Sequence, residues 1–337
     1  MNSLSRRAFV AQTFSIAAFS TQAFAAAPKW AARQYHNQPA SSPLHEALVS
    51  IWSAVKVQTG GRLEVTVYPQ NNQIAGSDPA ALKLLQEGGL EFYTLMGGIL
   101  ANVVPAMDVQ GLPFVFKTPR QVYRLNRGPL GRHLDAECRA KGIERIAGGL
   151  LENGFRQLNL VEKPVRNLDD LAGLKIRVPD GQMFRDFFST MGAQPVTLNI
   201  NRLYDALKDK SVDGQENPLV IAHTNKLFEV TKYMSMSNHM WSGFNLLSNG
   251  DFWKRLPPDV RAIIERNVVK YVEVQRKVTD DLNVSLEATL KERGMVFNTP
   301  DTSSFARKLA DGFYGRWKTQ LGSKTWAVLE AGVGKVG

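Results

Sequence analysis

The sequence of 337 residues contains a single cysteine, Cys138, which excludes an intrachain disulfide. No other Cys or His stands around it at the spacing of a metal site or an activated nucleophile, so Cys138 is interpreted as a bystander on a helix. Stability must therefore come from packed cores, and a hydrophobic content of 44% in a chain of this length is sufficient for two domains. We expect no bound metal and no cofactor.

Motifs that carry common enzyme chemistry are also missing. The sequence has no Gly-x-Ser-x-Gly nucleophile elbow and no Walker phosphate-binding loop. His45-Glu46 is followed by Val49 at the position where a zinc protease needs its second histidine. The tail at 332–337 has the letters of a dinucleotide fingerprint, but neither a preceding strand nor a following helix is expected there. The sequence therefore does not predict an enzyme.

Beyond the N-terminus, the sequence has no uncharged apolar run of the length, about 18 residues, that a membrane span requires. The N-terminus has Arg6-Arg7, an apolar run over residues 10–19 and small residues at 23–25, which is the order of an export signal. Because Phe9 follows the paired arginines, the signal resembles the twin-arginine type, with the general secretory route as the alternative. Residues 1–27 are assigned to this signal.

The net charge of the chain is +10, and subtracting Arg6 and Arg7, the only charged residues of the first 27, leaves +8. Such basicity is common in nucleic-acid-binding proteins, but here basic residues are scattered among acidic ones, as in the segment 254–266. No arginine-rich block with interleaved aromatic residues occurs. We expect no nucleic-acid partner, and instead a positive surface that steers anionic ligands.

Strand and helix patterns alternate along the first half of the mature chain. Ser42-Pro43 and Asp78-Pro79 are typical caps of helices, and alternating apolar residues over 63–67 predict a strand. This alternation indicates a mostly parallel sheet with helices on both faces. Over residues 257–294 apolar residues recur at helical spacing with almost no breaker, which predicts one long helix.

The stretch from residue 150 to 218 places planar polar groups next to short apolar strands. Arg177 is flanked by Ile176 and Val178, and Pro179 ends this strand because proline lacks a ladder donor. A guanidinium at the carboxyl end of such a strand lies where open α/β sheets bind ligands, and its fork can hold a carboxylate through two hydrogen bonds. The alternative interpretation is an arginine that extends from a strand end to water.

Three sequence blocks in this stretch carry a family resemblance. They are Asn-Gly-Phe-Arg-Gln at 153–157, Gly-Leu-Lys-Ile-Arg-Val-Pro at 173–179 and Val-Asp-Gly-Gln-Glu-Asn-Pro at 212–218. In this order they resemble the signature blocks of the DctP-type solute-binding proteins, the extracytoplasmic receptors of TRAP transporters, which are driven by ion gradients. A looser similarity extends over nearly all of the mature chain.

The resemblance implies an α/β, two-lobed periplasmic-binding-protein fold, with mixed, mostly parallel sheets and a long helix bracing both lobes. We assign residues 28–153 and 242–281 to lobe I, and residues 154–241 and 282–337 to lobe II. The resemblance further implies a monomeric periplasmic receptor that delivers a small-molecule carboxylate to the membrane subunits of a TRAP transporter. An exported enzyme acting on a small carboxylic acid is the alternative, because catalytic residues distant in sequence can converge in a fold.

The resemblance also implies specific ligand contacts. Arg177 makes a bidentate contact with the carboxylate, Arg156 adds a second cationic contact, and Asn217 hydrogen-bonds the ligand. From the residues alone, Asn217 is equally consistent with a turn residue before proline. The remaining candidates for the ligand site are Asn37, Met96, Ile200 and Trp241.

The wall facing Arg177 is expected to be apolar, since it includes Met96, Ile99 and Ile200. Such a wall leaves the hydroxyl groups of a polyol unpaired, at about 1 to 3 kcal/mol each. The sequence therefore favours a monocarboxylate with an apolar body, such as an aromatic or branched-chain oxo or hydroxy acid. Sialic acid, uronic acids and C4-dicarboxylates are disfavoured.

Overall fold

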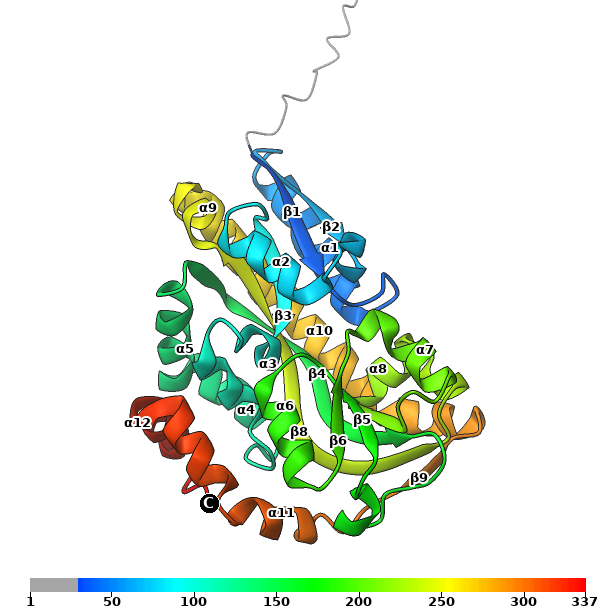
Figure 1. Cartoon of the computed structure of the whole chain (residues 1–337). Coiled ribbons are helices and arrows are strands. Elements are labelled where there is room, and N and C mark those ends of the chain that lie inside the picture. The colour runs from blue at the N-terminus through cyan, green and yellow to red at the C-terminus, as the bar shows by residue number, and fades with distance from the viewer. Residues whose placement is uncertain (1–29) are drawn as a thin grey trace, which may run out of the picture.

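The computed structural model describes residues 30–337, which form one nine-stranded sheet flanked by helices (Figure 1). The strands are β1 (Trp30–His36), β2 (Leu63–Tyr68), β3 (Phe92–Met96), β4 (Ile143–Leu160), β5 (Lys175–Val178), β6 (Gln194–Thr197), β7 (Gly214–Asn217), β8 (Tyr233–Asn249) and β9 (Val296–Asn298). The helices are α1 (Pro43–Gln58), α2 (Ser77–Gln86), α3 (Gly97–Leu100), α4 (Pro119–Arg127), α5 (Pro129–Arg139), α6 (Gln182–Thr190), α7 (Leu203–Lys208), α8 (Leu219–Thr224), α9 (Gly250–Arg255), α10 (Pro258–Glu292), α11 (Ser303–Ala310) and α12 (Phe313–Val333). Short 3₁₀ turns include η2 (Pro105–Gly111) and η4 (Ile200–Arg202).

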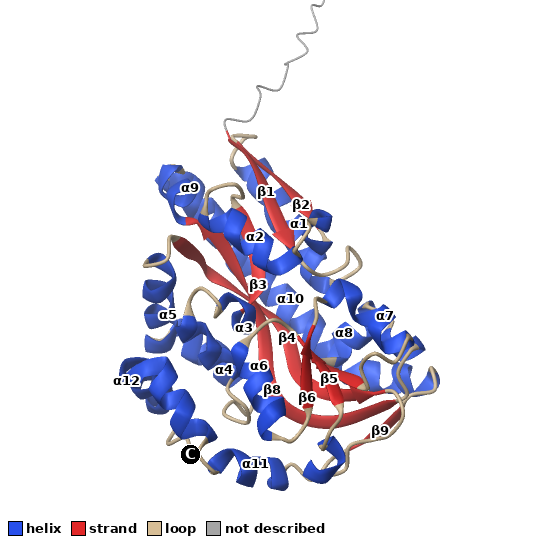
Figure 2. Ribbon diagram, in the orientation of Figure 1, coloured by secondary structure: helices blue, strands red, loops and turns tan. Residues whose placement is uncertain are grey.

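The sheet runs in the order β2-β1-β3-β8-β4-β7-β5-β6, with β9 paired to β8. The pairs of β1 with β2 and β3, of β5 with β6 and β7, and of β8 with β9 are parallel. The long central strands β4 and β8 are antiparallel to each other and to β7 and β3, respectively. Helices cover both faces of this sheet (Figure 2). The predicted α/β fold with mixed, mostly parallel strands is confirmed.

Strands β4 and β8 connect the two halves of the molecule, and their pairing is irregular along the way. The register shifts between Arg145 and Leu150, between Glu152 and Gly154, and between Arg156 and Leu158. Gly154 has φ +120°, and a Cβ atom there would lie 2.7 Å from Nδ2 of Asn283 on α10. Bulges of this kind bend a strand and increase its twist, so they allow one continuous sheet to serve two lobes.

Helix α10 is the long helix that the sequence predicts, and it passes behind the crossing strands (Figure 1). The buried Gln275 accepts a hydrogen bond from the backbone N–H of Glu152 at 2.9 Å and donates to its carbonyl at 2.8 Å. Asn283 donates to the carbonyl of Asn153 at 3.2 Å. These side chains satisfy backbone groups at the irregular part of β4, so the helix braces the point where the lobes join.

The C-terminal helix α12 packs against α5 and η2. His133 on α5 is hydrogen-bonded to Thr325 at 2.9 Å, and the Tyr314 hydroxyl donates to the carbonyl of Pro113 at 2.9 Å. The C-terminal helix, expected in lobe II, therefore contacts residues expected in lobe I, and the lobe boundaries stay a prediction. Within residues 30–337, no helix is both long and apolar enough to span a membrane.

Candidate functional site

A small cavity of about 30 Å³ lies at the carboxyl ends of the parallel strands of both halves of the sheet. Its lining comes from the segments that follow β1 and β3 on one side and from β5 and β7 on the other. The lining residues are Asn37, Gln38, Asp78, Met96, Ile99, Asn153, Arg156, Arg177, Pro179, Ile200, Asn217, Ile221 and Phe244. Six of the seven site residues proposed from the sequence therefore meet here, and Trp241 does not.

Arg177 is the cationic group of this cavity that has free donors. Its side chain is buried, with 3% of the residue exposed, and its Nε atom donates to the carbonyl of Leu198 at 2.7 Å. Within residues 30–337, neither of its terminal nitrogens has a hydrogen-bond partner. Burial, reinforced by the nearby charge of Arg156, lowers the pKa of Arg177 to about 10, so it is still protonated at neutral pH. A buried cation with two free parallel donors is suited to bind a carboxylate.

Arg156 lies in the same cavity, but most of its donors are occupied. It forms an ion pair with Glu216: Nε contacts Oε2, and the Nη2 atom lies 2.7 Å from Oε1 and 2.6 Å from the backbone carbonyl of Glu216. The Nη1 atom lies 3.3 Å from the sulfur of Met96, and the guanidinium lies over the ring of Phe184, 5.0 Å from its centroid. Only this Nη1 edge is left to serve the second cationic contact predicted from the sequence.

Glu216 was not singled out from the sequence, although the third family block contains it. Besides Arg156, it contacts Nε2 of His239 at 3.2 Å, and His239 contacts the Ser237 hydroxyl at 2.8 Å and stacks on Phe187. Burial alone raises the pKa of Glu216, but the attraction of Arg156 and the hydrogen bonds outweigh it, so the pKa lies below its ordinary value. Burial lowers the pKa of His239, against the attraction of Glu216. No local sequence pattern indicated these partners, because Arg156 and His239 lie on other strands, β4 and β8.

Asp78 also has a role in the cavity that the sequence did not predict. The sequence predicted Asp78-Pro79 as a helix cap. Helix α2 begins one residue earlier, and the buried carboxylate turns into the cavity instead. It accepts hydrogen bonds from Asn37 and Asn199 at 3.1 Å each, from Asn71 at 2.7 Å and from the Tyr93 hydroxyl at 2.9 Å. Since Asn199 follows β6, this carboxylate links the two halves of the molecule.

Amide oxygens add acceptors to the cavity. Asn153 donates to Ser242 at 3.0 Å, Asn217 donates to Gln215 at 2.6 Å, and Gln38 donates to Asn37 at 2.8 Å. Among the described residues, the side-chain oxygens of Asn153, Asn217 and Gln38 accept no hydrogen bond. The cavity thus has hydrogen-bond acceptors as well as the apolar wall expected from the sequence, and these acceptors favour ligand hydroxyl groups.

Trp241 lies outside the cavity lining, and its indole N–H donates to Glu152 at 2.9 Å. The other neighbours of this carboxylate are the Tyr123 hydroxyl and the backbone N–H of Asn153. Burial raises the pKa of Glu152 to about 7. The contact places Trp241 at the irregular part of β4, where it supports the junction of the lobes. No group of three His, Cys, Asp or Glu side chains within residues 30–337 could hold a metal ion.

Replacing Glu216 with glutamine leaves the charge of Arg156 buried and unpaired. We expect Glu216→Gln to lower the free energy of unfolding at pH 7 by about 3 to 5 kcal/mol, measured by chemical denaturation. Because the folded-state pKa is depressed, the contribution of this carboxylate is complete above about pH 4.3 and is lost as the pH falls below that value. The difference between wild type and variant should therefore shrink in acid.

The matched control is Glu229→Gln, since Glu229 is exposed and its carboxylate accepts a hydrogen bond from the Tyr204 hydroxyl at 2.8 Å. It should change the unfolding free energy by less than about 0.5 kcal/mol. Equal stability of Glu216→Gln and wild type at pH 7 would contradict the importance of the buried pair.

Comparison with known proteins places this geometry in a family. The profile of the bacterial extracellular solute-binding proteins of family 7, DctP, matches residues 35–314. The C4-dicarboxylate-binding periplasmic protein DctP of Rhodobacter capsulatus is 30% identical over 240 residues, which cover 70% of each chain. These relatives are solute-binding proteins and not enzymes.

Solved structures of TRAP periplasmic solute-binding proteins have the same fold. One from a Sulfitobacter species, with bound β-D-galacturonate, is 24% identical with a TM-score of 0.85, covering 91% of this chain and 100% of its own. Another from Chromohalobacter salexigens, with bound D-glucuronate, is 25% identical with a TM-score of 0.83, covering 89% of this chain and 98% of its own. The chain therefore belongs to the DctP family of bacterial extracellular solute-binding proteins.

Proposed function

We propose that this protein is a periplasmic receptor that binds a small organic acid in the cavity between its lobes and delivers it to the membrane subunits of a TRAP transporter. The observation that carries the proposal is Arg177, a buried guanidinium with two unpaired terminal nitrogens at the carboxyl end of β5. A ligand carboxylate would neutralise this charge and use both donors. The named relatives are periplasmic binding proteins for dicarboxylates or structures with bound uronates, all of which carry a carboxylate.

The rest of the cavity defines the body of the ligand. Met96, Ile99, Ile200, Ile221 and Phe244 supply apolar contact. Acceptor oxygens of the surrounding amides suit one or two hydroxyl groups. We therefore propose a small monocarboxylate with a hydroxyl near the acid and an apolar end, that is, a hydroxy acid from the class that the sequence favoured. The acceptors argue for a hydroxy acid over an oxo acid, since an oxo group cannot donate.

Ligand binding requires the lobes to separate, because small-molecule sites typically enclose about 300 to 1,000 Å³ and this cavity is about 30 Å³. The hydrogen bonds that cross between the halves near the cavity include those from Asn199 to Asp78 and from Asn102 to the carbonyl of Asp180, the latter at 2.9 Å. We propose that they break on opening and re-form around the ligand, with the irregular parts of β4 and β8 as the hinge. The membrane subunits would then select the closed surface of a monomeric receptor.

We also propose that the chain reaches the periplasm by the twin-arginine route. The motif that supports this proposal, Arg6-Arg7 followed by Phe9, lies outside the described residues. Replacing both arginines with lysine should block export in cells whose general secretory pathway is intact, measured as periplasmic protein by immunoblot. Undiminished export would indicate the general secretory route instead.

The receptor function is tested by isothermal titration calorimetry of the mature protein with a panel of acids. We expect a saturable one-to-one complex with an aliphatic or aromatic 2-hydroxy acid. D-galacturonate, succinate and the corresponding 2-oxo acids should bind at least about tenfold more weakly, because each unpaired polar group costs about 1 to 3 kcal/mol. No binding to any carboxylic acid would overturn the receptor function, whereas a uronate preference would overturn only the ligand class.

Arg177→Ala should weaken binding of the tightest acid by about a hundredfold to several thousandfold, because the ligand carboxylate loses a buried partner worth about 3 to 5 kcal/mol. Arg177→Lys should restore only part of this affinity, since an ammonium lacks the parallel donors. The control is Arg166→Ala, an exposed arginine of the same half, with an unchanged dissociation constant. Equal affinity of Arg177→Lys and wild type would show that Arg177 is not a bidentate anchor.

Hinge closure should be visible in small-angle X-ray scattering. We expect the radius of gyration to fall when the tight ligand is added, and the scattering curve of the complex to match the compact arrangement described here. A one-to-one complex confirmed by calorimetry serves as the control for saturation. Superimposable curves with and without ligand would disprove the closure.

A further inference from the structure

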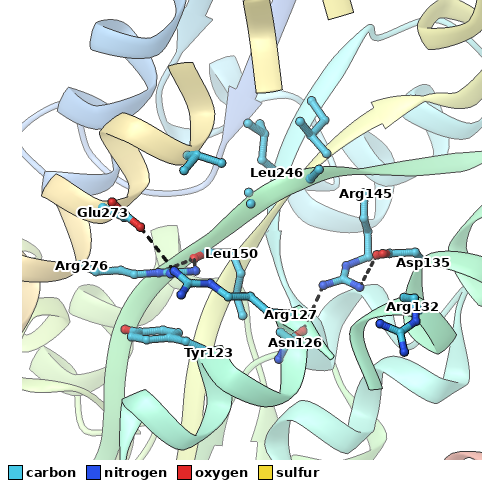
Figure 3. A pocket seen from close by; sticks show the side chains of 15 residues that line it. Tyr123, Asn126, Arg127, Arg132, Asp135, Arg145, Leu150, Leu246, Glu273 and Arg276 are labelled. Atoms are coloured by element: carbon cyan, nitrogen blue, oxygen red, sulfur yellow. Dashed lines mark hydrogen bonds and ion pairs between the residues drawn. The ribbon is translucent and has the colours of Figure 1, made fainter. Parts of the chain in front are cut away.

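A second, larger pocket of about 360 Å³ lies away from the cavity of Arg177 and shares no lining residue with it (Figure 3). It is formed by α4, α5, the first part of β4, β8 and α10. Its volume falls within the range of about 300 to 1,000 Å³ typical of small-molecule sites. The carboxylate binding proposed for the Arg177 cavity does not involve this pocket.

The floor of the pocket is the first irregular part of β4, where register with β8 is lost between Arg145 and Leu150. Gly148 has φ +77°, and a Cβ atom there would lie 2.6 Å from Val269 of α10. A Cβ atom on Gly149 would lie 2.9 Å from Cβ of Leu246. The backbone is therefore packed tightly against its neighbours, and Ile146, Leu150, Leu246 and Val269 supply an apolar base.

The rim carries four arginines and two carboxylates: Arg127, Arg132, Arg145, Arg276, Asp135 and Glu273. Arg145 is fully engaged, since it pairs with Asp135 at 2.6 Å and donates to Asn245 and Asn126 at 3.2 and 3.1 Å. Apart from the neutral pair of Arg145 and Asp135, the charged side chains of the rim are three arginines and one glutamate. The pocket therefore has an excess of positive charge above an apolar base.

Arg276 is held rigidly in place. Its Nε and Nη2 atoms donate to the carbonyl of Leu150 at 3.0 and 2.5 Å, and its guanidinium carbon lies 3.9 Å from the ring centroid of Tyr123. Within residues 30–337, its Nη1 atom has no hydrogen-bond partner. Burial lowers the pKa of Arg276, and the nearby charge of Arg127 adds to this although Tyr123 opposes it. The protein therefore stabilises the charged guanidinium of Arg276 less well than water does.

Beside Arg276, the guanidinium of Arg127 forms an ion pair with the Glu273 carboxylate, with 3.4 Å between Nη2 and Oε1. Their side chains are 68% and 60% exposed, and exposed pairs of this kind contribute little. Figure 3 shows the guanidinium groups of Arg127 and Arg276 on the same side of the pocket, next to Glu273. An incoming anion can therefore compete for Arg127 at low cost.

We propose that this pocket is a second ligand site, which binds a small organic anion with an apolar body, namely a phosphate ester or a carboxylate. The oxyanion group would be held by Arg127 and the free edge of Arg276 through charge-assisted hydrogen bonds, and Arg132, which lies on the other side of the pocket (Figure 3), would add positive charge. The apolar body would cover the base formed by Leu150, Leu246 and Val269. This site is independent of the carboxylate cavity, and its existence does not rest on the proposed receptor function.

The test uses phenyl phosphate as the probe and the mature Arg177→Ala protein, in which the carboxylate cavity lacks its anchor. Calorimetry should show one-to-one binding, at least about tenfold tighter than for inorganic phosphate because the ring is buried. Arg127→Ala combined with Arg132→Ala should weaken phenyl phosphate at least about tenfold, through lost charge-assisted hydrogen bonds. The matched control is Arg124→Ala, an exposed arginine of α4 outside the pocket lining, which should leave the affinity unchanged.

Three results would overturn the proposal. The first is no saturable binding of phenyl phosphate up to about 10 mM, the weak end of the millimolar range. The second is equal affinity of the double variant and the parent, which would place the probe elsewhere. The third is an equal loss in Arg124→Ala, which would indicate diffuse attraction to a basic surface. Inorganic phosphate binding as tightly as phenyl phosphate would refute the apolar part of the site.

Discussion

Two arginines and two carboxylates, Arg156, Arg177, Asp78 and Glu216, share a buried space at the strand ends of this protein, and the way they are paired governs the site. Glu216 neutralises Arg156, while Arg177 has only a carbonyl oxygen on its Nε atom. The Asp78 carboxylate accepts hydrogen bonds from amides and a hydroxyl, and among the described residues no carboxylate forms an ion pair with Arg177. Because an unpaired buried charge is costly, a ligand anion can supply the missing partner. The fixed pair also has a geometric role, because it holds the second guanidinium beside Met96 and Phe184.

The architecture explains how this site can be both buried and accessible. Parallel strands of both halves direct their carboxyl ends toward the same cavity, and β4, β8 and α10 run through both halves. The hydrogen bonds of Gln275 and Asn283 to β4 satisfy backbone groups where pairing is irregular. The hinge proposed above would thus bend at the bulges without exposing unpaired backbone groups, and the lobes would move as units.

The two pockets differ in how their positive charge is presented. In the first, Arg177 is buried in a cavity that amide side chains and apolar residues also line. In the second, Arg276 is stacked on Tyr123, and exposed arginines of the same pocket add to the positive charge. Tyr123 itself donates to Glu152, which is adjacent to Asn153 in the first cavity. The pockets are therefore neighbours along β4, although they have no lining residue in common.

The sequence by itself determined the alternating α/β elements, the long helix α10 and the position of Arg177, because these depend on local periodicity, on Pro179 and on three family blocks. It also indicated Asn37, Met96, Ile200 and Asn217, which lie in the cavity. Only the tertiary structure paired Glu216 with Arg156, turned Asp78 away from a capping role, placed Trp241 against Glu152 and packed α12 against α5. A repeat of two or 3.6 residues specifies which face a side chain occupies, whereas its partner comes from a distant segment that only the folded chain brings near.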